Sequence, residues 1–203
     1  MPWPLAGGYP EEVGDDAFED LPLDKWRWHP SPLAGQVVYV LTRSPQGVVN
    51  MAPKSWVTMA GFSGPVVGFG CSTTHHTCAN AVSTGAFTLS FPDAAQAQSA
   101  AAVSQAPRDQ RLGVAGLTLG DPSPGAVAHL RECPAFCECE LYRVVELEEQ
   151  EVFIFGRITR IAVRSGLTAQ GARQAYRELA PAFFLEPRVM AGLGPLMEEE
   201  PSP

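Results

Sequence analysis

The chain has 203 residues, of which 45% are hydrophobic, enough to bury the core of one domain with additional segments at its ends. Its formal net charge of −8 argues against a protein that binds nucleic acid through clustered basic side chains. No stretch reaches the roughly 18 consecutive apolar residues of a membrane-spanning helix. The acidic N-terminus also lacks the basic and apolar parts of a secretion signal, so we expect a cytoplasmic location without a membrane partner.

The two ends of the chain differ in composition from its middle. Residues 1–32 are rich in proline and acidic residues without helical or strand periodicity, which predicts an extended segment that Trp26 and Trp28 anchor on the core. Residues 33–190 form the expected domain, and residues 191–203 form an acidic tail, for which solvation is the default interpretation.

The first part of the domain alternates strands with turns. Residues 36–42 are β-branched and aromatic and end at a turn that contains Gly47, so a second strand at 48–59 is expected to return as a hairpin. Residues 65–70 are almost entirely apolar, as in a strand buried on both faces.

A short helix is expected at 77–84, with Thr77 as its N-cap and Gly85 just beyond its end. Residues 86–91 alternate apolar and polar side chains, which predicts a strand. A second helix is expected at 93–104 with Asp93 as its cap, whereas residues 108–130 contain many Gly and Pro residues and are assigned no regular structure.

Residues 135–164 predict two long antiparallel strands joined by a polar turn at 148–150. Six strands with two inserted helices and no repeating βαβ pattern favour a mainly β fold with a closed or nearly closed antiparallel barrel.

The cysteines are odd in number and no export signal is present, so we expect reduced thiols rather than a disulfide framework. No second pair of ligands follows the cluster at 133–139, so we expect no metal there. Cys137 and Cys139 instead lie on one strand face with Leu141, as small hydrophobic residues.

Two segments carry the strongest functional signal. The first is Asn50-Met51-Ala52-Pro53-Lys54-Ser55-Trp56, in a strand context. The second is the hydroxyl-rich loop Cys71-Ser72-Thr73-Thr74-His75-His76-Thr77, followed by Asn80. Hydroxyl groups and unpaired N–H groups at a helix N-terminus favour a phosphate, so this pair of segments suits a phosphate-bearing ligand.

The chain contains, in order, an N-x-A-P-x-S-W segment, an apolar strand, the Ser/Thr loop, T-x-x-N and T-G-x-F. This order of motifs resembles that of the flavin reductase-like, flavoredoxin-type proteins. The resemblance covers roughly residues 33–164. It implies an FMN-binding split antiparallel β-barrel, FMN or FAD as the cofactor, and a homodimer with its sites near the subunit interface.

By this resemblance the cofactor-binding residues are Asn50, Met51, Ala52, Pro53, Ser55, Trp56, Cys71, Ser72, Thr73, Thr74, His75, Thr77 and Asn80. His75 stands where the family usually carries a basic residue, and a partly charged imidazole predicts that phosphate affinity weakens as pH rises. Strand alternation places Lys54 on the face opposite Ser55, where we expect it to be solvated.

The resemblance implies an FMN-dependent oxidoreductase that takes a hydride from NAD(P)H onto bound FMN. The electrons then pass to a free flavin, a metal complex or a partner protein. The flavin carries this chemistry, so no catalytic side chain is expected. No G-x-G-x-x-G segment is present, so the nicotinamide is expected to stack on the exposed flavin face without a Rossmann domain.

Several alternatives stay open at this point. A flavoredoxin-type carrier would bind FMN without its own NAD(P)H turnover. A non-catalytic module would bind flavin or haem, with axial ligands chosen from His29, His75, His76 and His129. The hydroxyl-rich loop could simply cap a helix, Trp56 could be a core aromatic, and Asn80 could fix the loop.

Overall fold

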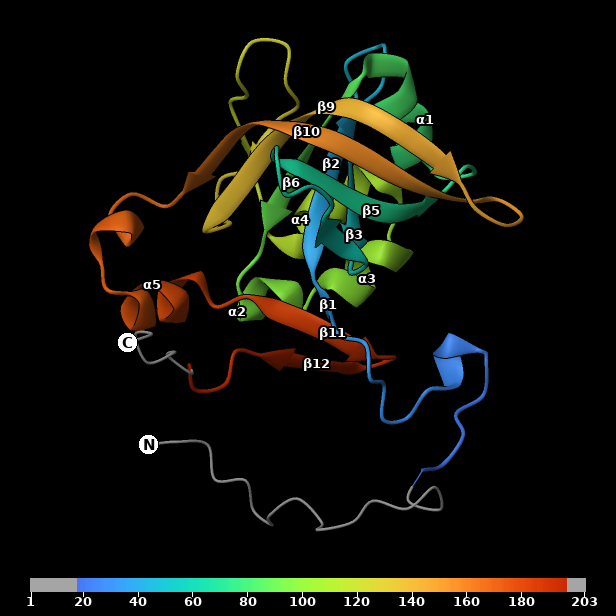
Figure 1. Ribbon diagram of the computed structural model, residues 1–203. Helices are drawn as coiled ribbons and strands as arrows, with labels where there is room; N and C mark the ends of the chain where they lie inside the picture. Colours follow the sequence, from blue (N-terminus) through green and yellow to red (C-terminus); the bar gives the residue numbers. More distant parts are fainter. Residues whose placement is uncertain (1–17, 197–203) are drawn as a thin grey trace.

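The computed structural model describes residues 18–196, and its central element is a curved antiparallel sheet of seven strands in the order β3-β2-β6-β9-β10-β5-β4 (Figure 1). In chain order these strands are β2 (Val38–Arg43), β3 (Val49–Lys54), β4 (Val57–Met59), β5 (Val66–Ser72), β6 (Ala86–Phe91), β9 (Ala135–Glu146) and β10 (Glu151–Val163). Strands β3 and β4 follow each other in the chain but lie at opposite edges of the sheet. The sheet therefore curls into a split antiparallel barrel, which confirms the expected fold.

The expected single strand at 48–59 is wrong, because the chain breaks into β3 and β4 at Ser55 and Trp56. Residues of β3 pair with β2, whereas the Trp56 carbonyl accepts a hydrogen bond from the Gly70 N–H at 3.0 Å and β4 pairs with β5. This change of partner carries the chain from one edge of the barrel to the other.

Helix α1 (His76–Thr84) lies near the ends of β2, β3 and β5, on the side shown at the upper right of Figure 1. It ends at Gly85, as expected, because φ is 69° there and glycine adopts this left-handed conformation without strain. Its expected N-cap is wrong. His75 occupies that position with extended backbone angles, while the buried Thr77 side chain accepts a hydrogen bond from Asn50.

The expected helix at 93–104 is two helices, α2 (Ala94–Ala97) and α3 (Ala100–Gln105). Asp93 caps α2, with Gln96 completing a capping box. The Gln96 carbonyl accepts hydrogen bonds from the hydroxyls of Tyr39 and Ser99 at 3.1 and 2.8 Å. Side-chain bonds to this carbonyl compete with the next helical bond, which explains the interruption.

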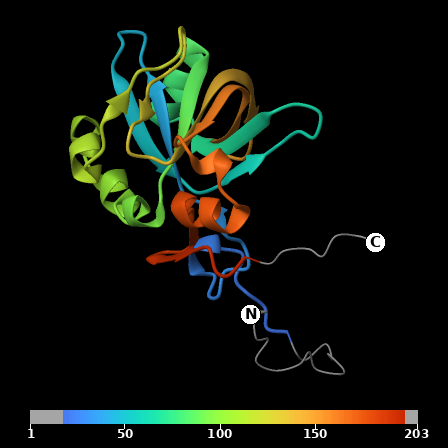
Figure 2. The ribbon, with the colours of Figure 1, turned by 90° about the vertical axis from the view of Figure 1, so that its left-hand side faces the viewer.

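Residues 108–130 contain regular structure that the sequence analysis did not assign. The structure has η3 (Arg108–Gln110), α4 (Arg111–Ala115) and a hairpin of β7 (Leu119–Gly120) and β8 (His129–Leu130). Helices α3 and α4 pack together beside β3, and Figure 2 shows them in yellow-green on one side of the sheet. The segment thus covers a face of the sheet.

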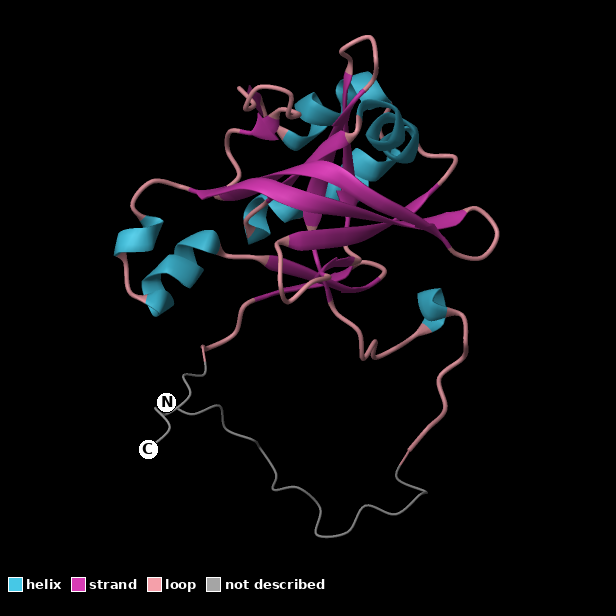
Figure 3. Ribbon diagram, turned by 45° about the horizontal axis from the view of Figure 1, so that its top comes forward, coloured by secondary structure: helices cyan, strands magenta, loops and turns pink. Residues whose placement is uncertain are grey.

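A second, three-stranded sheet in the order β1-β11-β12 lies below the barrel in Figures 1 and 3. It consists of β1 (Gly35–Gln36), β11 (Ala182–Glu186) and β12 (Val189–Gly192). The remaining short elements are η2 (Lys25–Arg27), η4 (Leu167–Ala169) and α5 (Ala172–Leu179). Residues 1–17 and 197–203 of the two expected terminal segments lie outside the described residues.

The barrel core brings together side chains from β2, β5, β6, β9 and β10, with Phe69 and Phe87 in edge-to-face contact at 5.1 Å. Cys137 and Cys139 are buried in this core, as expected for small hydrophobic residues. Glu138, between them, is also fully buried, so the simple alternation of buried and exposed positions fails there. No helix among the described residues is long and apolar enough to cross a membrane.

Candidate functional site

The hydroxyl-rich loop between β5 and α1 is held at both ends by hydrogen bonds. The Ser72 hydroxyl accepts from the Thr74 N–H at 3.2 Å, and the Ser72 carbonyl accepts from the His75 N–H at 3.1 Å. Thr73 donates its N–H and its hydroxyl to the Gln150 carbonyl, at 2.8 and 3.3 Å. The turn between β9 and β10 therefore fixes the loop in place.

The start of α1 leaves backbone donors unpaired. His75 is the N-cap but its side chain makes no capping hydrogen bond. The N–H groups of His76 and Thr77 have no acceptor among residues 18–196. The neighbouring side chains of Thr73, Thr74 and His75 are exposed. Unpaired N–H groups, the positive end of the helix dipole and nearby hydroxyls together form a donor set suited to a phosphate.

A buried polar network joins α1 to two strands of the barrel. The Asn50 side-chain amide donates to the Thr77 hydroxyl at 3.1 Å, and the Asn80 amide donates to the Thr42 hydroxyl at 3.3 Å. All four residues are buried. Because unpaired buried polar groups are costly, these bonds specify how α1 lies against β2 and β3. The side-chain hydrogen bond of Asn80 thus joins α1 to β2 rather than to the loop.

Lys54 also belongs to this region, where its side chain is partly exposed. Its Nζ lies 3.4 Å from Nδ1 of His75. Alternation along β3 places Lys54 on the same face as Asn50 and Ala52, which is the face that α1 approaches. Lys54 therefore lies on the same strand face as two of the predicted cofactor-binding residues.

Arg111, from α4, is a further basic residue that the sequence analysis missed. Its Nη1 donates to the Asn50 side-chain oxygen at 3.2 Å and to the Met51 carbonyl at 2.9 Å. Its position depends on the packing of a segment to which no regular structure was assigned. No sequence motif marks it.

The pKa of His75 lies below its ordinary value. Partial burial is the largest cause, and the charges of Lys54, Arg111 and His76 lower it further. The imidazole is therefore mostly neutral at pH 7, and the positive charge near the loop comes mainly from Lys54 and Arg111. The nearby Cys78 thiol is also neutral, because burial and then Cys71 raise its pKa.

Trp56 is not a core aromatic, because 42% of its surface is exposed. The Lys25 ammonium lies 3.9 Å from the centroid of its ring, and the Trp26 ring lies 5.8 Å away. The expected anchoring of the N-terminal segment thus includes Trp26, whereas the Trp28 indole donates locally to the Pro22 carbonyl at 2.6 Å.

The structure brings both predicted segments to one end of the barrel, but their side chains differ in accessibility. Five of the predicted cofactor-binding residues are buried, namely Asn50, Met51, Cys71, Thr77 and Asn80. Four others are partly exposed, namely Ala52, Pro53, Ser55 and Ser72, and the remaining four are exposed, namely Trp56, Thr73, Thr74 and His75. A ligand in solvent can therefore reach the side chains of the four partly exposed and the four exposed residues.

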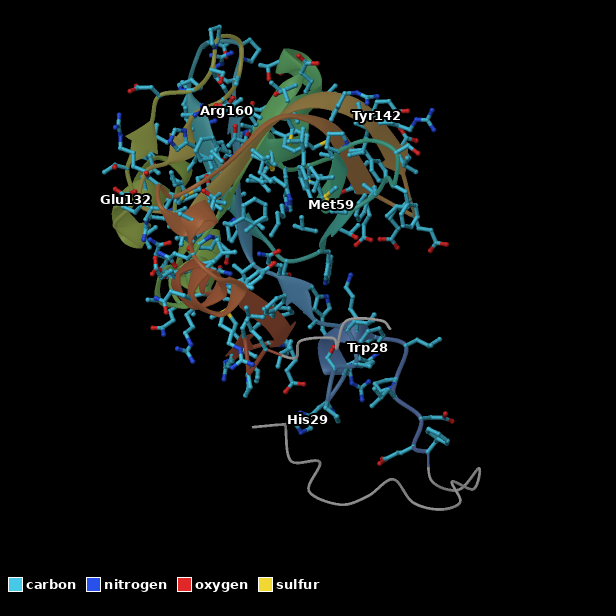
Figure 4. The ribbon with its side chains drawn as sticks, turned by 60° about the vertical axis from the view of Figure 1, so that its left-hand side comes forward. Trp28, His29, Met59, Glu132, Tyr142 and Arg160 are labelled. Carbon is cyan, nitrogen blue, oxygen red and sulfur yellow. The ribbon has the colours of Figure 1, made fainter. Side chains whose placement is uncertain are left out.

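Two of the histidines considered as haem ligands lie elsewhere. His29 contacts the Glu186 carboxylate at 2.9 Å, at the end of the molecule away from Arg160 (Figure 4). His129 stacks on Phe136 with ring centroids 3.9 Å apart. Among residues 18–196, no group of three or more His, Cys, Asp and Glu side chains is arranged to hold a metal ion.

The solved structures that share this architecture include three whose similarity is as follows. Nitrilotriacetate monooxygenase component B from Bacillus cereus is 20% identical, with a TM-score of 0.77 over 95% of this chain and 100% of that chain. Flavoredoxin from Methanosarcina acetivorans is 14% identical, with a TM-score of 0.73 over 90% and 95% of the two chains. A Shewanella frigidimarina protein described as a flavin reductase with a split barrel domain is 16% identical, with a TM-score of 0.75 over 95% and 100%.

These identities establish the shared fold. No curated protein matches the sequence. The family model of the flavin reductase like domain matches residues 31–180, which include the whole seven-stranded sheet and both predicted segments. The chain therefore belongs to the flavin reductase-like family.

Proposed function

We propose that this protein is an FMN-dependent oxidoreductase whose phosphate site is the Ser72–His75 loop with the start of α1. The observation that carries the proposal is the pair of unpaired N–H groups, on His76 and Thr77, at the start of α1 next to this hydroxyl-rich loop. Lys54, 3.4 Å from His75, adds positive charge in a chain whose formal net charge is −8. A dianionic phosphate fits this donor set better than a neutral ligand does.

The flavin ring and ribityl chain are assigned to the end of β3 and the break that follows it. Ala52, Pro53 and Ser55 are partly exposed there, and Trp56 is half-exposed. Ala52 and Pro53 have small side chains that leave room for a flat ring, and the Ser55 hydroxyl can bond a ribityl hydroxyl or a ring carbonyl. Family membership and the accessibility of these residues support this assignment.

When bound, the flavin supplies the hydride chemistry, and the chain's own residues bind and orient it. Asn50 and Thr77 hold α1 against β3 so that its first N–H groups stay in place, while Lys54 offsets the phosphate charge. All strand pairs among the described residues are antiparallel, so this part of the chain contains no Rossmann sheet. NAD(P)H would therefore stack on the open face of the flavin.

A homodimer is part of the same proposal. Apolar side chains are exposed at the β4 edge and along the β9–β10 ribbon, including Met59, Phe62, Tyr142 and Ile161. Exposed apolar surface of this kind is common where subunits meet. A second copy placed there would cover it.

Anaerobic NADH or NADPH should bleach the absorbance of FMN bound to the purified protein, because hydride transfer reduces the flavin. The measurement is the visible spectrum of the complex before and after each nucleotide, with free FMN as the control. A complex that stays yellow with both nucleotides would replace the reductase with a flavoredoxin-type carrier. A haem absorption band in place of a flavin spectrum would support the haem-binding module.

Lys54→Gln should weaken FMN binding by about tenfold or more, since hydrogen bonds to charged groups contribute about 1.5–3 kcal/mol. Arg188→Gln is the matched control, because it removes one positive charge from the β11–β12 turn of the other sheet. Fluorescence titration of both variants measures the two affinities. Equal affinities in the two variants would remove Lys54 from the phosphate site.

The ratio of FMN affinity between the parent and His75→Gln should rise as pH falls from 8 to 5.5. His75 attracts the phosphate with a positive charge only when it is protonated, and its pKa without ligand lies below the ordinary value near 6.5. Gln can replace the single N–H donor of the neutral imidazole, so the two proteins should bind FMN almost equally at pH 8. Taking the ratio cancels the titration of the phosphate itself. A ratio that stays constant over this range would show that His75 does not face the phosphate.

A further inference from the structure

A cavity of about 520 Å³ lies at the other end of α1 from the candidate phosphate site. Its wall includes Thr84 and Gly85, where α1 ends, the loop 123–126, and parts of β9 and β10. This volume is within the range of cavities that hold small organic ligands. The proposed flavin site uses none of these residues.

The cavity wall contains a buried carboxylate that is only partly satisfied. The side chain of Glu138 is 1% exposed. Its Oε1 accepts hydrogen bonds from the Ser123 N–H at 3.0 Å and from Arg160 Nη1 at 3.3 Å. Its Oε2 is buried without a hydrogen-bond partner among the described residues. A buried carboxylate oxygen without a partner is costly, which points to a donor that completes the site.

Glu138 is ionised at neutral pH. Burial alone would raise its pKa, but the hydrogen bonds from Ser123 and the charge of Arg160 outweigh burial, so the pKa lies below its ordinary value. The carboxylate is therefore negatively charged, with Arg160 as its one ion-pair partner among the described residues.

The two residues that hold this carboxylate also line the cavity, so the carboxylate lies at its wall. Arg160 is a weak ion-pair partner of the Glu138 carboxylate. Its side chain is 46% exposed on β10 (Figure 4), and its contacts with Glu138 and Ser123 are 3.3 and 3.4 Å. Charge-assisted hydrogen bonds are usually about 2.7–2.9 Å long.

The charge of the wall selects the kind of ligand. Glu138 and Glu140 line the cavity with one basic residue, Arg160, and Thr84 and Thr159 belong to the same wall. We propose that this cavity binds a small organic cation whose primary ammonium group donates to the Glu138 carboxylate. The site is separate from the proposed flavin site, so neither proposal depends on the other.

Calorimetric titration with n-butylammonium at constant ionic strength and pH 7.5 tests the proposal. Binding should be saturable with one site per chain, and n-butanol, which has no positive charge, should bind at least about tenfold more weakly, as expected for a lost charge-assisted bond. Glu138→Gln should weaken butylammonium binding by a similar factor. Glu140→Gln, the matched control in the same wall, should change it by less than about threefold, as for an exposed charge.

Because Glu138 is buried, its variant must first retain the parent's circular dichroism spectrum and melting temperature. If it does not, Thr159→Phe decides, since it fills the cavity without removing the carboxylate and should abolish binding. Three results would overturn the proposal: no saturable binding of butylammonium, equal affinity for butanol, or unchanged binding in the folded Glu138→Gln or Thr159→Phe variant. Each of these results would mean that Oε2 of Glu138 is hydrated and does not bind an ammonium group.

Discussion

The candidate site depends on a buried hydrogen-bond network that fixes one helix against the barrel. Asn50 bonds Thr77, and Asn80 bonds Thr42, with all four side chains out of contact with bulk water. Losing one partner would leave another buried polar group unsatisfied, at a cost of about 1–3 kcal/mol. The network therefore favours a single position for α1 and, with it, the position of the unpaired N–H groups at its start. Residues that resembled ligand contacts in the sequence thus have a structural role in the chain itself.

The electrostatics of the loop follow from the same arrangement. Lys54 lies beside His75, and Arg111 donates a hydrogen bond to Asn50 nearby. Positive charge is therefore concentrated at the loop of a chain whose net charge is negative. These charges, together with burial, lower the pKa of His75. The loop can therefore attract a phosphate without a protonated histidine, and the helix N-terminus adds its own dipole.

The barrel and its central strands could be predicted from the sequence, because alternation, apolar runs and residues such as Gly85 and Asp93 report local conformation directly. The break at Ser55 and the position of Arg111 could not, because both depend on which strands and helices meet in the folded chain. The burial of Glu138 could not be predicted for the same reason. Cys137 and Cys139 fit a strand that buries only one face, but the loop at Ser123 covers the other face, where Glu138 lies. The β1-β11-β12 sheet pairs strands far apart in the chain, which local patterns do not report.

The central claim is that the start of α1 binds the phosphate of a flavin. Titrating the protein with FMN and with riboflavin, which has the same ring and ribityl chain but no phosphate, tests it most directly, with quenching of flavin fluorescence as the signal. The account predicts that FMN binds about 100-fold more tightly, because hydrogen bonds to a charged group contribute about 1.5–3 kcal/mol each. Equal affinities would contradict the account, because they would show that the start of α1 does not bind the phosphate.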